Sequence, residues 1–174
     1  MIVGTTVQNS LKMTRFYRRL YQSPLGPLSI VVDEESLVGI WFCDQANCEE
    51  GIDHIEERCR PLHEAVFEWL DQYFLGENPS MPFPLSPQGT DFQQRVWAYL
   101  AKIPYGESQT YGEIARALSC GSAQAIGQAV GRNPLILLIP CHRVLGTEKK
   151  LTGYAAGLDR KRWLLQHEAI SWKE

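Results

Sequence analysis

A cluster of four prolines limits how this 174-residue chain can fold. Pro79, Pro82, Pro84 and Pro87 lie between residues 76 and 89. Proline at that density interrupts both helices and strand ladders, because it has no backbone N–H and its ring clashes with the preceding turn. We therefore predict a linker over residues 76–89. The chain then divides into an N-terminal domain, residues 1–88, and a C-terminal domain, residues 89–174.

The two parts carry opposite net charge. Residues 1–90 hold 6 basic and 13 acidic side chains, a net charge of −7, whereas residues 91–174 hold 11 basic and 7 acidic side chains, a net charge of +4. The overall charge of −3 argues against general nucleic-acid binding, but the basic second part leaves such a partner open. With 44% hydrophobic and 21% charged residues, the composition excludes collagen-like, low-complexity and disordered chains.

The sequence favours a soluble intracellular protein. Its longest apolar run, residues 135–141, is far shorter than the roughly 20 residues that a membrane span needs. The N-terminus lacks a signal-peptide pattern, and residues 1–12 are polar and aperiodic, so we treat them as a candidate leader without a function. Five cysteines, an odd number without an export signal, indicate reduced thiols rather than a disulfide framework.

The N-terminal part predicts a small antiparallel sheet covered by one helix. Residues 16–21, 28–32 and 37–42 are short β-branched and aromatic runs separated by turn residues. A helix is predicted after Pro61 and before Gly76. Its apolar residues recur at helical spacing: Leu62, Val66, Trp69, Leu70 and Tyr73.

The C-terminal part predicts helices with capped starts. Thr90 precedes a helix that ends at Pro104, Thr110 precedes one that runs to about Leu118, and Ser122 can cap a third that runs to about residue 131. The last two helices, joined by a tight glycine turn, match a helix-turn-helix, although a plain helical hairpin gives the same pattern. We predict an α+β protein whose C-terminal domain is mainly helical and winged helix-turn-helix-like.

The third of these helices is rich in small side chains, which are Ala123, Ala125, Gly127, Ala129 and Gly131. They let its backbone approach another surface closely, and its N-terminal amides can then donate to phosphate oxygens. Close packing against a neighbouring helix is the alternative explanation.

A Cys-His-Arg cluster follows the longest apolar run. We predict a buried strand over residues 135–139 that delivers Cys141, His142 and Arg143. A thiol becomes a useful nucleophile when a base takes its proton and positive charge lowers its pKa. Because adjacent side chains rarely face each other, we expect a water between Cys141 and His142, with Glu168 of the helical segment 160–168 orienting the imidazole. The alternative is an inert buried thiol beside a solvated histidine.

The remaining cysteines give no convincing metal site. Cys43, Cys48 and Cys59, with His54 and His63, are residue types that bind zinc, but they lack a Cys-x-x-Cys pair. We expect neither a metal nor a cofactor.

Five motifs occur in a specific order over residues 85–170. They are Tyr111-Gly112-Glu113-Ile114-Ala115, Asn133-Pro134, Ile139-Pro140-Cys141-His142-Arg143-Val144, Gly153-Tyr154 and Trp163-Leu164-Leu165-Gln166-His167-Glu168. Together they strongly resemble the O6-alkylguanine-DNA alkyltransferases. The resemblance implies a protein that transfers an alkyl group from O6 of guanine, and in many members from O4 of thymine, irreversibly to its own cysteine. One protein molecule would then repair one lesion.

The resemblance also implies a role for each matching residue. Cys141 would be the acceptor, His142 the water-mediated base, and Glu168 the residue that holds His142 in the useful tautomer. Asn133 would brace the turn that carries the active-site segment, and Tyr111 would donate toward N3 of the departing guanine. Tyr154 would form a pocket wall, and main-chain groups of Cys141, Val144 and Ala155 would contact the edge of the base.

Double-stranded DNA containing O6-alkylguanine is the implied partner, with the damaged base flipped into the pocket and the second helix of the helix-turn-helix in the minor groove. The side chains expected at DNA are Ala123, Gln124, Ala125, Ala129, Arg132 and Arg143, with Arg116, Lys149 and Lys150 as candidates for phosphate contacts. Gln124 stands where the family usually has an arginine that fills the space left by the flipped base, which predicts weaker extrusion or help from another side chain. We expect a monomer without a membrane or an obligate protein partner, cytoplasmic at the nucleoid or nuclear in a eukaryote.

Two other functions stay open. Alkyltransferase-like proteins recognise damaged bases without repairing them, but they lack the acceptor cysteine that is present here as Cys141. A cysteine hydrolase using Cys141, His142 and Glu168 would turn over repeatedly, but it leaves the Tyr111 motif and the helix-turn-helix without a role.

Overall fold

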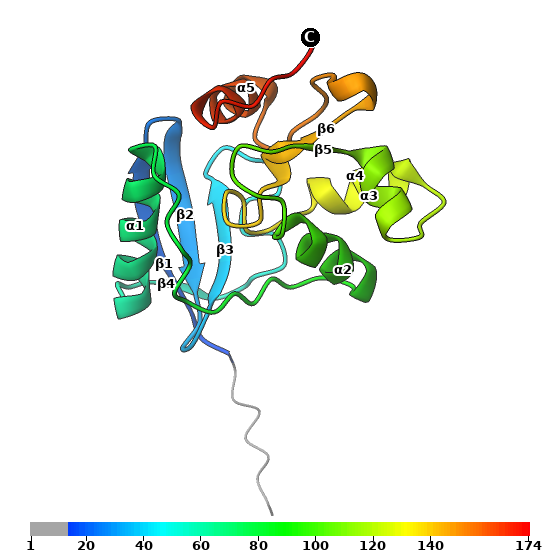
Figure 1. Ribbon diagram of the computed structural model, residues 1–174. Helices are drawn as coiled ribbons and strands as arrows, with labels where there is room; N and C mark the ends of the chain where they lie inside the picture. Colours follow the sequence, from blue (N-terminus) through cyan, green and yellow to red (C-terminus); the bar gives the residue numbers. More distant parts are fainter. Residues whose placement is uncertain (1–13) are drawn as a thin grey trace, which may run out of the picture.

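The N-terminal domain is a four-stranded sheet with one helix packed alongside it (Figure 1). The computed structural model describes residues 14–174, so the candidate leader lies outside the described residues. Strands β1 (Phe16–Ser23), β2 (Gly26–Val32) and β3 (Leu37–Phe42) pair antiparallel, as predicted. An additional short strand, β4 (Ile55–Glu57), pairs parallel with β1. The sheet order β3-β2-β1-β4 is therefore mixed rather than wholly antiparallel, because three residues are too few to show a strand pattern in the sequence.

Helix α1 (Pro61–Phe74) covers one face of the sheet. It begins at Pro61, whose missing N–H costs nothing in the first helical turn. It buries Val66, Leu70 and Tyr73 against the side chains of β1 and β2. Helical spacing in the sequence therefore correctly predicted both the helix and its buried face.

The proline-rich segment is bound along the edge of the sheet. The Leu37 N–H donates to the Pro84 carbonyl at 2.9 Å, and the Ser86 N–H donates to the Leu37 carbonyl at 2.8 Å. Proline is compatible with this position, since an edge segment needs no complete row of donors. The segment is free of helix, as predicted, and it also closes one side of the sheet.

The C-terminal domain contains the predicted helices. They are α2 (Asp91–Leu100), α3 (Tyr111–Ala117), α4 (Ala123–Gly131) and α5 (Leu158–His167). Thr90 and Thr110 each complete a capping box, and the Ser122 hydroxyl accepts from the Ala125 N–H. These bonds, which are reciprocal in the two capping boxes, satisfy amides that have no partner inside the helix. Two short strands, β5 (Gln109–Thr110) and β6 (Val144–Leu145), pair parallel, and single 3-10 turns η1 (Cys141–Arg143) and η2 (Thr147–Lys149) complete the domain.

The apolar run before Cys141 is buried, but the prediction of a strand there is wrong. Residues 135–139 fold into consecutive turns, with Leu137 at φ 72° and the Ile139 N–H donating to the Leu135 carbonyl at 2.8 Å. The Asn133 side chain closes this turn with two hydrogen bonds to its backbone. The strand prediction failed because the apolar pattern of a short run does not distinguish a buried turn from a buried strand.

The two domains share one hydrophobic core. The Ile40 N–H of β3 donates to the Pro134 carbonyl at 2.8 Å, and Arg160 of α5 donates to the Leu25 carbonyl at 3.1 Å. Figure 1 shows α5 lying above the sheet, with α1 on the left of the picture and α4 on the right. Between residues 14 and 174, none of the helices combines the length and the apolar character that a bilayer span requires.

Candidate active site

Cys141 lies at a small pocket between the helix-turn-helix and the loop before α5. The residue is 3% exposed and begins η1. The pocket has a volume of about 250 Å³ and is lined by Tyr111, Gly127, Val130, Gly131, Cys141, Gly153, Tyr154 and Ala155. The fold thus brings Tyr111, Cys141, Tyr154 and Ala155, all singled out in the sequence, to one cavity. Val144 lies buried in β6.

Asn133 holds the turn that leads to Cys141. Its Oδ1 accepts from the Leu135 N–H at 2.9 Å, and its Nδ2 donates to the Ile139 carbonyl at 2.7 Å. The side chain is 1% exposed, so neither backbone group has water as an alternative partner. One amide therefore spans the turn, as the predicted bracing role requires.

His142 and Glu168 form a fully buried pair. The His142 Nε2 and the Glu168 Oε2 are 2.5 Å apart, and both side chains have no exposed area. An ionised carboxylate only accepts hydrogen bonds, so we assign the proton to Nε2. The Nδ1 atom then carries a lone pair, and among residues 14–174 it has no hydrogen-bond partner. Nδ1 is thus the basic atom of this ring.

Glu168 is held ionised by the groups around it. Arg143 donates from Nε to Oε1 at 2.7 Å, and the Gly106 N–H donates to the same oxygen at 3.2 Å. Burial would raise the pKa of this carboxyl, but the hydrogen bonds from His142 and Arg143 and the positive charge of Arg143 outweigh burial and hold the pKa well below its usual range. Burial lowers the pKa of His142 despite the neighbouring carboxylate, so the imidazole is neutral near pH 7.

The Cys141 thiol is protonated at rest. Its burial raises the pKa, and this effect is opposed by hydrogen bonding from Asn133 and by the positive charge of Lys161. Lys161 is buried and donates from Nζ to the carbonyls of Val144 at 2.6 Å, Thr152 at 3.1 Å and Gly153 at 3.3 Å. Burial lowers the pKa of Lys161 to about 8. A base is therefore required to make the thiolate.

Two residues expected at DNA are turned into the protein. Arg143 is 8% exposed, and besides Glu168 it donates to the Ile103 carbonyl at 2.6 Å, which corrects the expectation that it faces DNA. Ala129 is 3% exposed, and its carbonyl accepts from the Trp97 Nε1 at 2.8 Å, so this alanine packs against α2 instead. Its small side chain serves helix packing, the alternative that the sequence left open.

The other residues of that set lie at or near the surface. Ala123 and Gln124 are exposed at the start of α4, and Ala125 is partly exposed. Arg132 is exposed and pairs with Glu50 of the N-terminal domain at 2.7 Å. The candidates for phosphate contacts are also exposed: Arg116, Lys149 and Lys150.

The residues considered for zinc do not gather into a site. His63 is buried and accepts from the Arg60 N–H at 2.9 Å, which makes it part of the α1 cap. Cys43 and Cys59 are exposed, and Cys48 is partly buried. Over residues 14–174, no group of three or more His, Cys, Asp or Glu side chains is arranged to hold a metal ion.

Two buried polar residues of this site, Lys161 and Tyr73, were not identified as site residues from the sequence. Lys161 lies three and four residues before the buried Leu164 and Leu165 on α5, and this helical spacing is the signal that marks it as buried. Tyr73 was expected in the core of the N-terminal domain, yet its hydroxyl donates to Glu168 at 2.7 Å. No local pattern links residues so far apart along the chain.

Fold and site together define a class: a helix-turn-helix protein with a buried cysteine beside a buried His-Glu pair. A family model for the 6-O-methylguanine DNA methyltransferase ribonuclease-like domain matches residues 16–87, and one for the DNA binding domain of the same family matches residues 91–170. The chain therefore belongs to the 6-O-methylguanine DNA methyltransferase family.

Individual relatives agree with this assignment. The methylated-DNA–protein-cysteine methyltransferase of Methanosarcina acetivorans is 44% identical over 87% of this chain and 97% of its own length. That of Haemophilus influenzae is 41% identical over 92% of this chain and 90% of its own length. The structure of Mycobacterium tuberculosis OGT in complex with DNA superposes with a TM-score of 0.79 at 40% identity, covering 87% of this chain and 92% of that one.

Proposed function

We propose that Cys141 accepts the alkyl group in a DNA-repair reaction of the direct-reversal type. The protein is a methyltransferase of the cysteine-alkylating class, as are its relatives. The observation that carries the assignment of Cys141 is its position at the pocket beside α4, directly before the buried His142–Glu168 pair. The other cysteines among residues 14–174 lie outside this pocket, and none of them is fully buried.

Each group at the site has a distinct task in the transfer. The proton of the Cys141 thiol passes through one water to Nδ1 of His142, and Glu168 stabilises the imidazolium that forms. The thiolate attacks the alkyl carbon in line with its bond to O6 of guanine. A new sulfur–carbon bond forms as the carbon–oxygen bond breaks, and the electron pair moves onto the base. The Tyr111 hydroxyl donates toward N3, where it stabilises that charge.

The product limits each protein molecule to one reaction. A thioether has no good leaving group, and no residue of the site can restore the thiol. The protein is therefore consumed as one lesion is repaired. Neither a metal nor a cofactor takes part in this scheme.

The substrate in this proposal is double-stranded DNA containing O6-alkylguanine, with the base flipped into the pocket at a cost of a few kcal/mol. Tyr154 forms a wall, and main-chain groups of Cys141, Val144 and Ala155 read the base edge. The exposed start of α4, with Ala123, Gln124 and Ala125, supports its placement in the minor groove. Arg132, Arg116, Lys149 and Lys150 then face phosphates. The protein acts as a monomer, in the cytoplasm at the nucleoid or in the nucleus of a eukaryote.

Intact-protein mass spectrometry tests the proposal. The protein is incubated with excess duplex oligonucleotide containing O6-methylguanine and then mapped by peptide analysis. We expect one added methyl group, on Cys141, and one lesion repaired per protein. The same duplex without the lesion, and a Cys141→Ser variant, are the controls. Repeated turnover without modification would indicate a hydrolase, and lesion binding without modification would indicate a recognition protein.

Gln124 gives a second test of the DNA interface. Its neutral side chain brings less stacking surface and no charge to the space left by a flipped base. Gln124→Arg is therefore expected to tighten binding to duplex DNA or to speed repair. The same substitution at Gln22, in β1 of the N-terminal domain, is the matched control. Equal affinity and equal rate in Gln124→Arg and the unsubstituted protein would contradict this role.

A further inference from the structure

Tyr73 reaches from the N-terminal domain into the relay behind Cys141. Its hydroxyl donates to Oε2 of Glu168 at 2.7 Å, and His142 donates to the same oxygen at 2.5 Å. The tyrosine is 1% exposed, and the Glu168 side chain has no exposed area, so water does not compete for this bond. The two donors therefore share one carboxylate oxygen.

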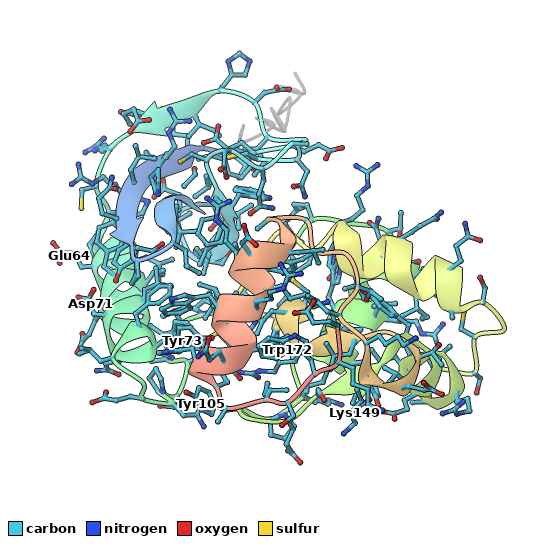
Figure 2. The ribbon with its side chains drawn as sticks, turned by 90° about the horizontal axis from the view of Figure 1, so that it is seen from above. Glu64, Asp71, Tyr73, Tyr105, Lys149 and Trp172 are labelled. Carbon is cyan, nitrogen blue, oxygen red and sulfur yellow. The ribbon has the colours of Figure 1, made fainter. Side chains whose placement is uncertain are left out.

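Packing on several sides holds the Tyr73 ring in place. Trp69 stacks on it at a centroid distance of 5.5 Å, Tyr105 meets it edge-on at 6.3 Å, and His167 of α5 lies 5.2 Å away. The His167 Nε2 also lies 2.7 Å from the Tyr73 carbonyl. Figure 2 shows Tyr73 between α1 and α5, with Tyr105 nearby. The position of the hydroxyl is thus set by α1, α5 and the segment after α2 together.

The Glu168 carboxylate is fully occupied by donors. Arg143 and the Gly106 N–H bind Oε1, while His142 and Tyr73 bind Oε2. A carboxylate offers about four lone-pair sites, so these donors leave it no freedom to rotate away from the imidazole. Because a charge-assisted hydrogen bond withdraws charge from its acceptor, the Tyr73 bond also reduces the negative charge that His142 meets.

We propose that Tyr73 is a positioning residue for alkyl transfer, which holds Oε2 of Glu168 toward His142 and sets how strongly that carboxylate supports the imidazolium. The inference rests on the proposed function, in which His142 takes the thiol proton. Since the other described donors to Glu168, namely Gly106, His142 and Arg143, all belong to the C-terminal domain, the inference gives the N-terminal domain a part in the reaction. The domain then completes the active site in addition to bracing it.

The direction of the effect follows from this shared oxygen. Removing the phenol hydroxyl returns charge to Oε2, which raises the pKa of His142, so the imidazole becomes protonated, and unable to act as a base, at a higher pH. The acidic limb of the pH–rate profile, where the rate falls as His142 becomes protonated, then shifts to higher pH. The other charged or titratable groups around the pair are unchanged by the substitution; they are Cys141, Arg143, Lys161, Tyr105, Tyr154 and His167.

Single-turnover methyl transfer from an O6-methylguanine duplex, measured between about pH 5 and pH 8, tests the proposal in the full chain. For Tyr73→Phe we expect the acidic limb to shift to higher pH by about 0.5 to 1 pH unit. At a pH on that limb, the rate should then be about three- to tenfold lower than in the unsubstituted protein. The matched control is Tyr21→Phe. It removes the hydrogen bond that the Tyr21 hydroxyl of β1 donates to Asp71 of α1 at 2.5 Å, and Tyr21 does not contact Glu168. Its profile should coincide with that of the unsubstituted protein.

A second variant keeps the test decisive if Tyr73→Phe does not fold. Site-specific replacement of Tyr73 by 3-fluorotyrosine retains the hydroxyl and makes it a stronger donor, so the limb should move in the opposite direction. Coinciding limbs in the folded variants and the unsubstituted protein would overturn the role of Tyr73. Absence of methyl transfer to Cys141 in the unsubstituted protein would instead overturn the proposed function, so the two failures are distinct.

Discussion

Replacing Asn133 with alanine should destabilise the whole protein, although the change removes only one amide. The side chain serves two buried backbone groups, the Leu135 N–H and the Ile139 carbonyl. A buried polar group that loses its partner costs about 1–3 kcal/mol. With both groups unpaired, we expect Asn133→Ala to lower the free energy of unfolding by roughly 2–6 kcal/mol, a large share of the 5–15 kcal/mol typical of native proteins.

Urea unfolding followed by tryptophan fluorescence measures this loss, since the chain has five tryptophans. In a protein of this size each kcal/mol corresponds to about 2–4 °C, so the thermal midpoint should fall by roughly 4–24 °C. The control is Asn78→Ala, at an exposed position without a side-chain hydrogen bond, and we expect a change within about 0.5 kcal/mol. If Asn133→Ala lost no more stability than Asn78→Ala, the turn would not depend on this amide.

Three further predictions concern the pair behind Cys141, the packing of α4 and the reactivity of the thiols. The pKa of Glu168 in the folded protein lies below its unfolded value near about 4.3, so its stabilising contribution is present above that pH and is lost as the pH falls. The free energy of unfolding of Glu168→Gln should therefore depend less on pH in the acid range than that of the unsubstituted protein. Equal pH dependence in the two proteins would argue against this. Trp97→Phe removes the 2.8 Å bond to the Ala129 carbonyl and should cost about 1–3 kcal/mol in urea unfolding, whereas Trp172→Phe, near the C-terminus, should cost little. With iodoacetamide near pH 8, exposed Cys59 should be labelled before buried Cys141, and peptide mapping that finds Cys141 modified first would contradict the protonated resting thiol.

The sequence predicted the elements whose signals are local. The hydroxyl residues at positions 90, 110 and 122 cap the three helices that they were expected to cap. Helical spacing identified α1 with its buried face, and β-branched runs identified the three antiparallel strands. The order of the motifs around Cys141 identified the family. In each case the physical cause lies within one helical turn or one strand, or in a contiguous motif, so the residues themselves carry the information.

The tertiary structure decided what depends on contacts between distant residues. Strand β4 exists because it pairs with β1, and the apolar run before Cys141 turns because Asn133 bonds both of its ends. Arg143 was expected at DNA, but the fold turns it toward Glu168 in the interior. Tyr73 meets the same carboxylate from another domain. A buried charge must find partners wherever the fold brings them, and sequence spacing does not report which distant groups those are.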